Sequence, residues 1–396
     1  MTSAPDARPF LTRFLSLDLL DNRYPALHGL RVLAIVSVVQ IHVTWILTGE
    51  HGFPLDRDFV AGSLTIFFGM DLFFMLSGFL IGSILLRSLE LEGTQNIRRF
   101  YLRRIFRTFP PYYVVLTLLA LTTALTATQR KHLPYEYIYA TNYLPLGHGD
   151  AVMLWGWSLA LEEQFYLVVP ALFFVLHRLR SDRARILLLV ALWTLALALR
   201  LYIYARYSPW ADLALNRALY FRTHTRFDTI VAGILLAFVH QRYGGAIGRW
   251  LTAPLHRALL ALPSMACLWL LLRPSMFGEH HIQLVHVFAW GTITSIMYFG
   301  ALLLLLHGNG WIHHALSAPF FRRLATLGYG VYLVHIPLFE RVVIPIAGAF
   351  HARQASMVLV WPACLLGDIL VSFVVAYAIH VLIEKPSMRL RQWLAA

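Results

Sequence analysis

The chain has 396 residues, of which 59% are apolar, and its mean hydropathy is +0.63. A soluble globular chain holds about 45–50% apolar residues, so this composition excludes an ordinary soluble domain. The formal net charge of +13 would suit a nucleic-acid-binding protein, but the basic residues are sorted by loop as the positive-inside rule describes. We therefore predict an all-α integral membrane protein and expect no nucleic-acid partner.

Ten apolar runs are long enough to cross a bilayer. They lie at about 30–48, 63–86, 111–127, 159–176, 186–205, 227–241, 256–272, 286–306, 325–350 and 356–383. If the N-terminus is inside, the cytoplasmic segments hold 21 of the 33 Lys and Arg residues and the external segments nine. This asymmetry predicts cytoplasmic N- and C-termini. We expect residues 1–29 to be a short cytoplasmic lead, residues 30–384 one membrane domain, and residues 385–396 a short cytoplasmic tail.

Two ionisable residues, Arg31 and His42, lie in the first apolar run. They are eleven residues apart, about 20° past three full helical turns, and so share one helix face. Lipid tails tolerate neither side chain, which predicts that this face points into the bundle. Two interpretations are open at this stage. Arg31 could reach the cytoplasmic surface while His42 hydrogen-bonds a neighbouring helix, or both could belong to an interior site.

The stretch RRFYLRRIFRTFPPYY, residues 98–113, carries five arginines just before the third predicted helix. Arg104 and Arg107 are three residues apart, and Arg103 and Arg107 are four apart. One helical turn would therefore present their guanidiniums to one ligand. Planar, permanently charged donors of this kind suit phosphate groups. A basic cluster that only attracts anionic lipid explains the charge equally well.

Two adjacent carboxylates, Glu162 and Glu163, lie at the mouth of the fourth predicted helix in WGWSLALEEQFYLVVP. They differ in direction by about 100°, so we expect that they cannot both face the same partner. Ser158 is four residues before Glu162, and this shared polar face favours Glu162 for a site and a structural role for Glu163. The Glu162 carboxylate could orient an imidazole, pair with an arginine, or cap the external end of its helix.

Asp71 is an isolated carboxylate in the second predicted helix, and we expect it to neutralise an arginine from a neighbouring helix. Ser77 and Gly78 follow it. We expect these small residues to permit close helix packing and assign them no chemistry.

Further polar residues interrupt later spans. Arg226 and Asp228, at the start of the sixth predicted helix, form either an acceptor-side polar cluster or an ion-paired helix start. His335, in GYGVYLVHIPL, is best interpreted as a hydrogen-bonded core histidine. Neither a glycine-rich phosphate loop nor a His-Glu-x-x-His pattern occurs in the sequence, so we predict no metal site.

Taken together and in this order, these segments resemble the acyltransferase-3 family of multi-pass membrane O-acyltransferases. The resemblance rests on LHGLRVLAIVSVVQIHVTW, GMDLFFMLSGFLIG, FYLRRIFRTFPPYY, WSLALEEQFYLVVPAL, TRFDTIVAG, YGVYLVHIPL and the terminal EKP. It spans about residues 27–386. Family members share an arginine and a histidine with ten residues between them on the first helix, and an Arg-x-x-Arg motif entering the third. These fall here on Arg31 with His42 and on Arg104 with Arg107.

The resemblance implies an enzyme that moves an acyl group, often acetyl, from cytoplasmic acyl-CoA to a hydroxyl of a surface carbohydrate, lipid-linked sugar or secreted metabolite. It implies a multi-pass protein of the bacterial cytoplasmic membrane, with acyl-CoA as co-substrate and no bound cofactor. His42 would be the general base, an interior position keeping the imidazole neutral. The remaining roles are Glu162 as a second catalytic residue, Arg31, Arg103, Arg104 and Arg107 as acyl-CoA ligands, and Asp71, Glu163, Arg226, Asp228 and His335 as acceptor-side or structural residues.

One alternative stays open, because a ten-helix bundle with interior ionisable residues also describes a permease or flippase for a polysaccharide precursor. The related halves typical of many transporters are not apparent in the sequence. Some members of the family carry an extracytoplasmic hydrolase-like domain, and we expect this chain to lack one.

Overall fold

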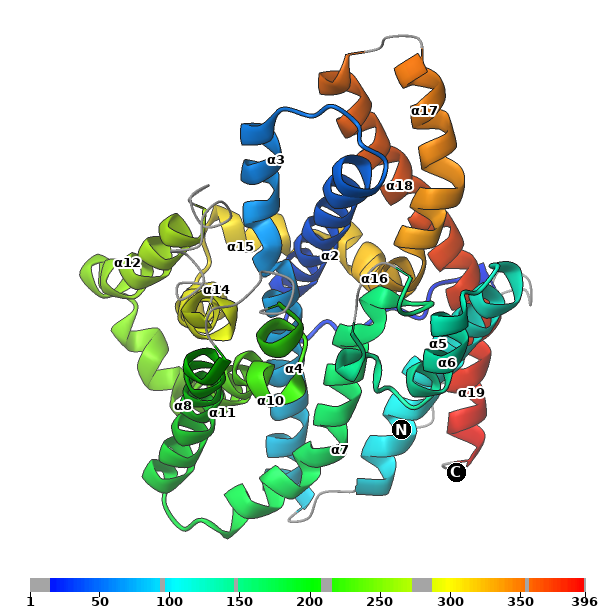
Figure 1. Ribbon diagram of the computed structural model, residues 1–396. Helices are drawn as coiled ribbons and strands as arrows, with labels where there is room; N and C mark the ends of the chain where they lie inside the picture. Colours follow the sequence, from blue (N-terminus) through cyan, green and yellow to red (C-terminus); the bar gives the residue numbers. More distant parts are fainter. Residues whose placement is uncertain are drawn as a thin grey trace.

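The computed structural model describes residues 15–92, 97–145, 149–207, 216–272, 287–352 and 356–394. Within these ranges all regular secondary structure is helical (Figure 1). In the described part of the chain, ten helices are long and apolar enough to cross a membrane, and they correspond one by one to the ten predicted runs. The prediction of an all-α, multi-pass membrane protein is therefore confirmed, while the cytoplasmic location of both termini stays a prediction.

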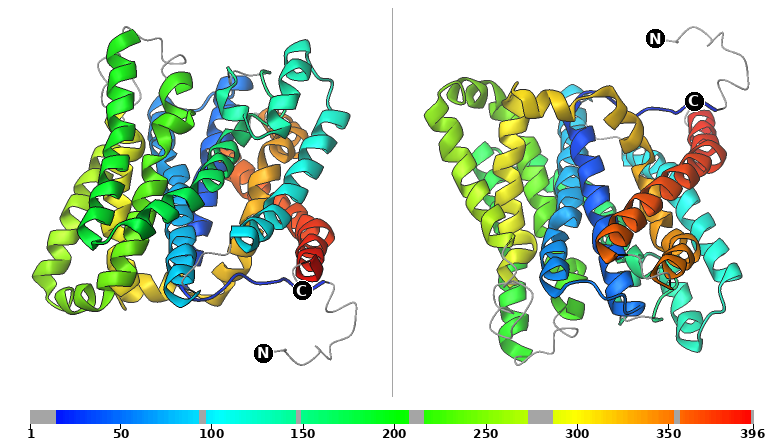
Figure 2. Two further views of the ribbon diagram at one scale, coloured as in Figure 1. Left: turned by 90° about the horizontal axis from the view of Figure 1, so that it is seen from below. Right: turned by 90° about the horizontal axis from the view of Figure 1, so that it is seen from above.

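The helices form one bundle, in which most of the long members lie side by side (Figure 2). In chain order the elements are α2 (Ala26–Trp45), η1 (Ile46–Glu50), α3 (Arg57–Leu64), η2 (Thr65–Phe68), α4 (Gly69–Glu92), α5 (Ile97–Thr122), α6 (Ala127–Tyr137), η3 (Thr141–Tyr143), η4 (Leu154–Gly156), α7 (Trp157–Arg178), α8 (Asp182–Tyr207), η5 (Asn216–Tyr220), α10 (Thr223–Arg226), α11 (Asp228–Trp250), α12 (Pro254–Leu271), η8 (Ala289–Ile293), α14 (Thr294–His307), α15 (Trp311–Leu316), α16 (Pro319–Leu338), η9 (Phe339–Val343), α17 (Ile344–Ala352), α18 (Met357–Ile379), η10 (His380–Glu384) and α19 (Lys385–Leu394).

The third span begins earlier than predicted. α5 begins at Ile97 rather than near residue 111, so the arginine cluster and both prolines lie inside the helix. Pro110 has no N–H to donate to the carbonyl of Phe106. The hydroxyl of Ser387 donates to this carbonyl instead, at 2.8 Å. A side chain from near the end of the chain thus satisfies the group that the proline leaves free, and the helix continues through it.

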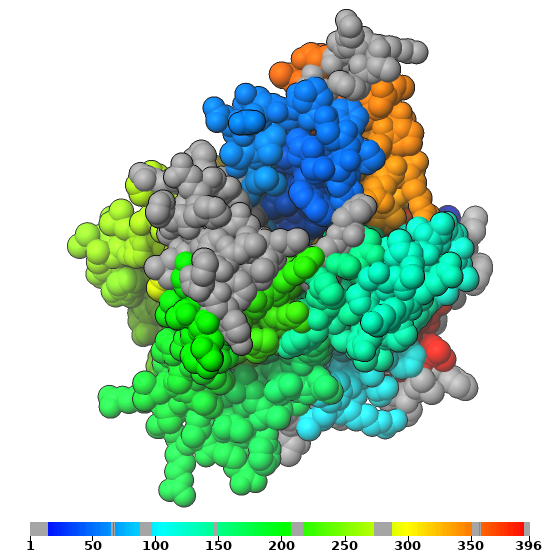
Figure 3. Space-filling view, in the orientation of Figure 1, coloured from blue at the N-terminus to red at the C-terminus, as the bar shows by residue number. Residues whose placement is uncertain are grey.

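The segment between the third and fourth spans packs along α5 and contains the helix α6. The hydroxyl of Tyr112 in α5 donates to the carbonyl of Glu136 in α6 at 2.8 Å. The Glu136 carboxylate is fully buried and accepts the N–H groups of Val152 and Met153 at 2.8 and 2.7 Å. Burial raises the pKa of Glu136, and these two donors oppose the rise because they favour the carboxylate. The α6 region, coloured teal, forms part of the face seen in Figure 3.

α4 and α11 cross at close range. A Cβ on Gly78 would lie 2.0 Å from the carbonyl oxygen of Ile230, and a Cβ on Gly233 would lie 2.3 Å from that of Met75. Any larger residue at either position would push the helices apart. The prediction that Gly78 permits close packing is confirmed.

The segment before α2 crosses one end of the bundle and passes near α19 (Figure 2). Lys385 Nζ donates to the carbonyl of Ser16 at 2.6 Å, and Arg322 Nε donates to the carbonyl of Leu20 at 2.7 Å. These bonds fix the described part of the predicted lead to α16 and α19. α2 itself begins at Ala26, four residues before the predicted start of the membrane domain.

Candidate active site

A cavity of about 240 Å³ lies between α2, α4, α5, α7 and α16. It brings together side chains that are far apart in the sequence. Its polar lining consists of Arg31, Ser77, Arg104, Arg107, Thr108, Ser158, Glu162, Tyr329 and Tyr332. Four residues predicted to form a site from separate motifs, Arg31, Arg104, Arg107 and Glu162, therefore share one cavity.

Arg31 and Arg107 face the cavity, and neither has a hydrogen-bond partner among the described residues. Both are partly buried, and no described side chain or carbonyl accepts a hydrogen bond from either guanidinium. The cavity lining holds three guanidiniums and one carboxylate, that of Glu162. An excess of planar, permanently charged donors in a partly enclosed space favours an anion with several oxygens, such as a phosphate.

Arg104 is held by α7 on three sides. Its Nη2 lies 3.3 Å from Glu162 Oε1, its Nε lies 3.3 Å from Glu163 Oε1, and its guanidinium carbon lies 3.4 Å from the ring centroid of Tyr166. The prediction that the two glutamates cannot face the same partner is wrong. A guanidinium offers donors along two edges, so one arginine from α5 can lie between adjacent positions of α7 and contact both.

Glu162 lies inside the bundle, and its carboxylate accepts hydrogen bonds from the hydroxyls of Ser77 and Tyr166 as well as pairing with Arg104. Of the three roles left open from the sequence, the structure shows the arginine pair. Ser77, for which only a packing role is predicted, also hydrogen-bonds Glu162 and Tyr166. The other side of α4 makes the close contact with α11, so Ser77 and Gly78 serve different neighbours.

His42 and His335 form a hydrogen-bonded pair between α2 and α16. His335 Nε2 lies 3.0 Å from His42 Nδ1, and His335 Nδ1 lies 2.8 Å from the carbonyl oxygen of Tyr332. His335 is fully buried, whereas His42 is partly exposed. The interpretation of His335 as a hydrogen-bonded core histidine is confirmed, and its partner is the histidine predicted to be the base.

The cavity stops short of this pair. Tyr332, one turn before His335, lines the cavity, and its hydroxyl lies 2.5 Å from Ser158 Oγ and 2.7 Å from the carbonyl oxygen of Trp155. His42 and His335 do not belong to the cavity lining. Tyr332 is therefore the cavity-lining residue one helical turn from His335.

Arg103 does not join the other arginines. Its side chain is exposed and is not part of the cavity lining, whereas Arg104 and Arg107 are. Adjacent helical residues point about 100° apart, so Arg103 leaves the face that Arg104 and Arg107 share. The prediction that Arg103 acts with them on one ligand is not supported by this geometry.

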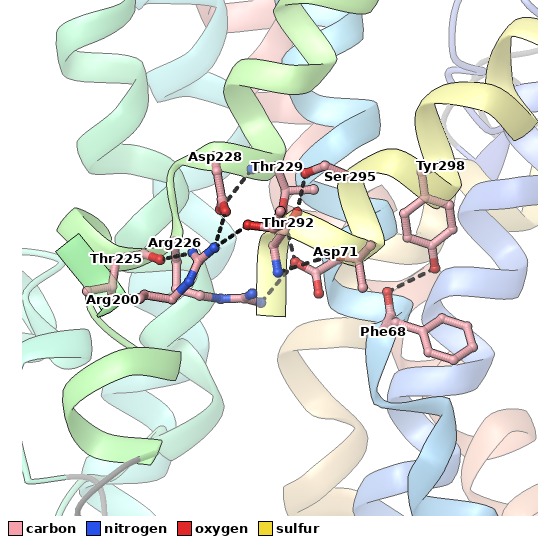
Figure 4. A network of polar contacts seen from close by, with 12 residues as sticks. Phe68, Asp71, Arg200, Thr225, Arg226, Asp228, Thr229, Thr292, Ser295 and Tyr298 are labelled. Atoms are coloured by element: carbon pink, nitrogen blue, oxygen red, sulfur yellow. Dashed lines mark hydrogen bonds and ion pairs between the residues drawn. The ribbon is translucent and has the colours of Figure 1, made fainter. Parts of the chain in front are cut away.

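A second polar cluster lies outside the cavity, at the junction of α4, α8, α10 and α11 (Figure 4). Arg226 Nη2 lies 2.9 Å from Asp71 Oδ1, and Arg200 Nη2 lies 2.7 Å from Asp228 Oδ2, with all four side chains fully buried. The prediction that Asp71 neutralises an arginine from a neighbouring helix is confirmed. For Arg226 and Asp228 the structure shows an ion-paired helix start.

Arg200 was not predicted to be part of any site. It also donates to the carbonyl of Val287 at 2.8 Å. Two further bonds, to the carbonyl of Thr225 at 2.5 Å and to Thr292 Oγ1 at 2.7 Å, are drawn in Figure 4. The sequence could have predicted a buried polar contact for Arg200, because an arginine in the interior of a membrane span requires an acidic or carbonyl partner. The tyrosines of the cavity gave no such signal, because tyrosine is common at many positions of membrane helices.

Comparison with known proteins identifies the chain's relatives. A family model described as an acyltransferase domain matches residues 24–377. The chain belongs to the acyltransferase-3 family.

Two curated relatives of this chain come from bacteria. The peptidoglycan O-acetyltransferase OatA of Listeria monocytogenes is 27% identical over 79% of this chain and 49% of the relative. The protein named "Putative peptidoglycan O-acetyltransferase YrhL" of Bacillus subtilis is 29% identical over 80% of this chain and 49% of the relative. The chain thus spans about half the length of these relatives. No solved structure matches it.

Proposed function

We propose that this protein is a membrane O-acyltransferase that moves an acetyl group from acyl-CoA to a hydroxyl of a surface carbohydrate. The observation that carries the proposal is the cavity, in which Arg31 and Arg107 are free for an anion and which ends one helical turn from the His42–His335 pair. The acetyl group and the carbohydrate are supported by the names of the relatives, which describe peptidoglycan O-acetyltransferases. Their sources also support a bacterial cytoplasmic membrane. A lipid-linked sugar or a secreted metabolite offers the same hydroxyl chemistry.

Arg31 and Arg107 bind the phosphates of the donor in this proposal. Arg104, which was expected to act with Arg107, is committed to Glu162 and Glu163 and shapes the cavity wall. Glu162 then has a positioning role, because its described partners are Arg104, Ser77 and Tyr166. The donor's thioester arm has to pass Tyr332 and Ser158 to reach His42, so their hydrogen bond opens during each turnover.

The reaction at the thioester of acyl-CoA, next to His42, is a single acyl transfer. The imidazole of His42 removes the proton from the acceptor hydroxyl while the hydroxyl oxygen attacks the thioester carbonyl. A new C–O bond forms and the C–S bond breaks. The proton passes from His42 to the sulfur of CoA, so the base is restored and no external proton is consumed.

The function is tested with the purified protein in vesicles, [¹⁴C]acetyl-CoA and a soluble glycan. We expect covalent label on the glycan. Label that crosses the membrane without becoming covalently attached would instead support the permease or flippase alternative. Vesicles without the protein give the background rate.

Replacing Arg107 by alanine should weaken acyl-CoA binding by about 10–100-fold, because a hydrogen bond to a charged group contributes about 1.5–3 kcal/mol. Arg31→Ala should behave in the same way. Equilibrium binding of labelled acetyl-CoA to the folded, purified variants measures the effect. Arg98→Ala is the matched control, since this arginine is exposed on the same helix. Wild-type affinity in both cavity variants would remove the phosphate assignment.

Acyl-CoA should be consumed on the side of the arginines and the acceptor modified on the opposite side. Helix geometry gives the reason: His42 is twelve residues beyond the predicted membrane entry at Leu30, or about 18 Å into a core about 30 Å thick. The sidedness of the reaction is measured in vesicles that hold the protein in a known orientation. Acetyl-CoA is supplied inside or outside, and an impermeant acceptor is supplied on the same or the opposite side. Transfer only when both substrates share one side would contradict it.

A further inference from the structure

The atoms around His335 determine which of its nitrogens carries hydrogen. The backbone carbonyl of Tyr332, 2.8 Å from His335 Nδ1, can only accept a hydrogen bond. His335 Nδ1 must therefore be protonated. A neutral His335 then has a lone pair on Nε2, the atom that faces His42 Nδ1 at 3.0 Å.

The same logic continues to His42. With a lone pair on His335 Nε2, the hydrogen between the two rings belongs to His42 Nδ1. A neutral His42 then carries its lone pair on Nε2, the nitrogen that does not face His335. We propose that His335 is the positioning residue of the reaction, holding His42 in the tautomer whose Nε2 can accept the proton of the acceptor hydroxyl.

Burial assigns the two histidines different tasks. His335 is fully buried between Trp155, Tyr332 and His42, so it cannot meet an acceptor itself. His42 is partly exposed and can. When His42 takes a proton on Nε2 it becomes a cation, and its Nδ1–H remains bonded to the lone pair of His335. No described carboxylate hydrogen-bonds either ring, so the lone pair of His335 and the backbone carbonyl of Val38 are the acceptors that can stabilise this cation.

This inference rests on the proposed function for its consequence in catalysis, but the tautomer can be measured without any turnover. Solid-state ¹⁵N spectra of the protein in lipid, with labelled histidine and His42→Gln to assign the signal, distinguish a protonated Nδ1 from a protonated Nε2. We expect His42 to be protonated on Nδ1. A neutral His42 protonated on Nε2 would overturn the inference even if the protein proves to be an active acyltransferase.

Two substitutions of similar polarity separate positioning from packing. Gln places its amide group near the position of histidine Nε2 and can accept the His42 Nδ1–H, whereas Asn reaches only the position of Nδ1 and can bond Tyr332 alone. We expect His335→Asn to lower kcat by about 10–100-fold, by analogy with loss of the hydrogen-bond partner that orients a metal-binding histidine. His335→Gln should restore most of the rate, and neither variant should change acyl-CoA affinity. Equal rates for Asn and Gln, or recovery by Asn alone, would contradict the proposal.

Discussion

Replacing His42 by alanine should abolish acyl transfer while acyl-CoA still binds. Loss of a general base typically lowers the rate about 10²–10⁴-fold. Binding should persist, because His42 is not part of the cavity lining that holds the arginines. Single-turnover transfer of [¹⁴C]acetyl groups, together with equilibrium binding of acetyl-CoA, separates the two effects.

The control for this experiment is His51→Ala, which removes an exposed histidine shortly after the same membrane span. It should leave both transfer and binding unchanged. If His42→Ala turns over at the wild-type rate with saturating substrates, the base lies elsewhere in the molecule. Glu162 is then the next candidate, because it is the carboxylate of the cavity.

Replacing Arg200 by methionine should destabilise the protein by about 3–5 kcal/mol, the usual cost of removing one member of a buried ion pair. The substitution removes four described hydrogen bonds and leaves Asp228 buried without its cation. The cluster joins α8, α11 and the region of η8, so the loss should affect the whole bundle rather than one helix. Thermal unfolding of the protein in nanodiscs measures it.

Two further variants test the origin of this effect. Arg206→Met removes an exposed arginine near the end of the same helix and should unfold like the wild type. The double variant Arg200→Met with Asp228→Leu should be more stable than Arg200→Met alone, because no charge is left unpaired. An Arg200→Met protein that unfolds at the wild-type temperature would show that the buried pair contributes little.

The predicted spans agree with the structure because helix formation within a membrane depends on each crossing segment alone. In the absence of water each crossing segment must satisfy its own backbone hydrogen bonds, so every apolar run of sufficient length becomes a helix. The start of α5 departs from the prediction for a tertiary reason. Ser387, nearly three hundred residues away, satisfies the carbonyl that Pro110 leaves free and allows a helix where the sequence favours a break.

Helical spacing also predicted part of the candidate site. Arg104 and Arg107 share a face of α5 because they are three residues apart, and Ser158 and Glu162 share a face of α7 because they are four apart. Both pairs line the cavity. The angle of about 100° between Glu162 and Glu163 did not prevent a shared partner, because the guanidinium of Arg104 is wide enough to contact both carboxylates from α5.

The sequence by itself determined the number of crossings, the family and the residues that cannot face lipid. Each of these depends on residues within a turn or two of one another, or on motif order along the chain. Only the tertiary structure decided which polar groups are partners: His42 with His335, Asp71 with Arg226, Arg200 with Asp228, and Arg104 with both glutamates. Each partner lies on a different helix, and the angle and height at which two helices cross are set by the packing of all their contacts, which no short stretch of sequence specifies.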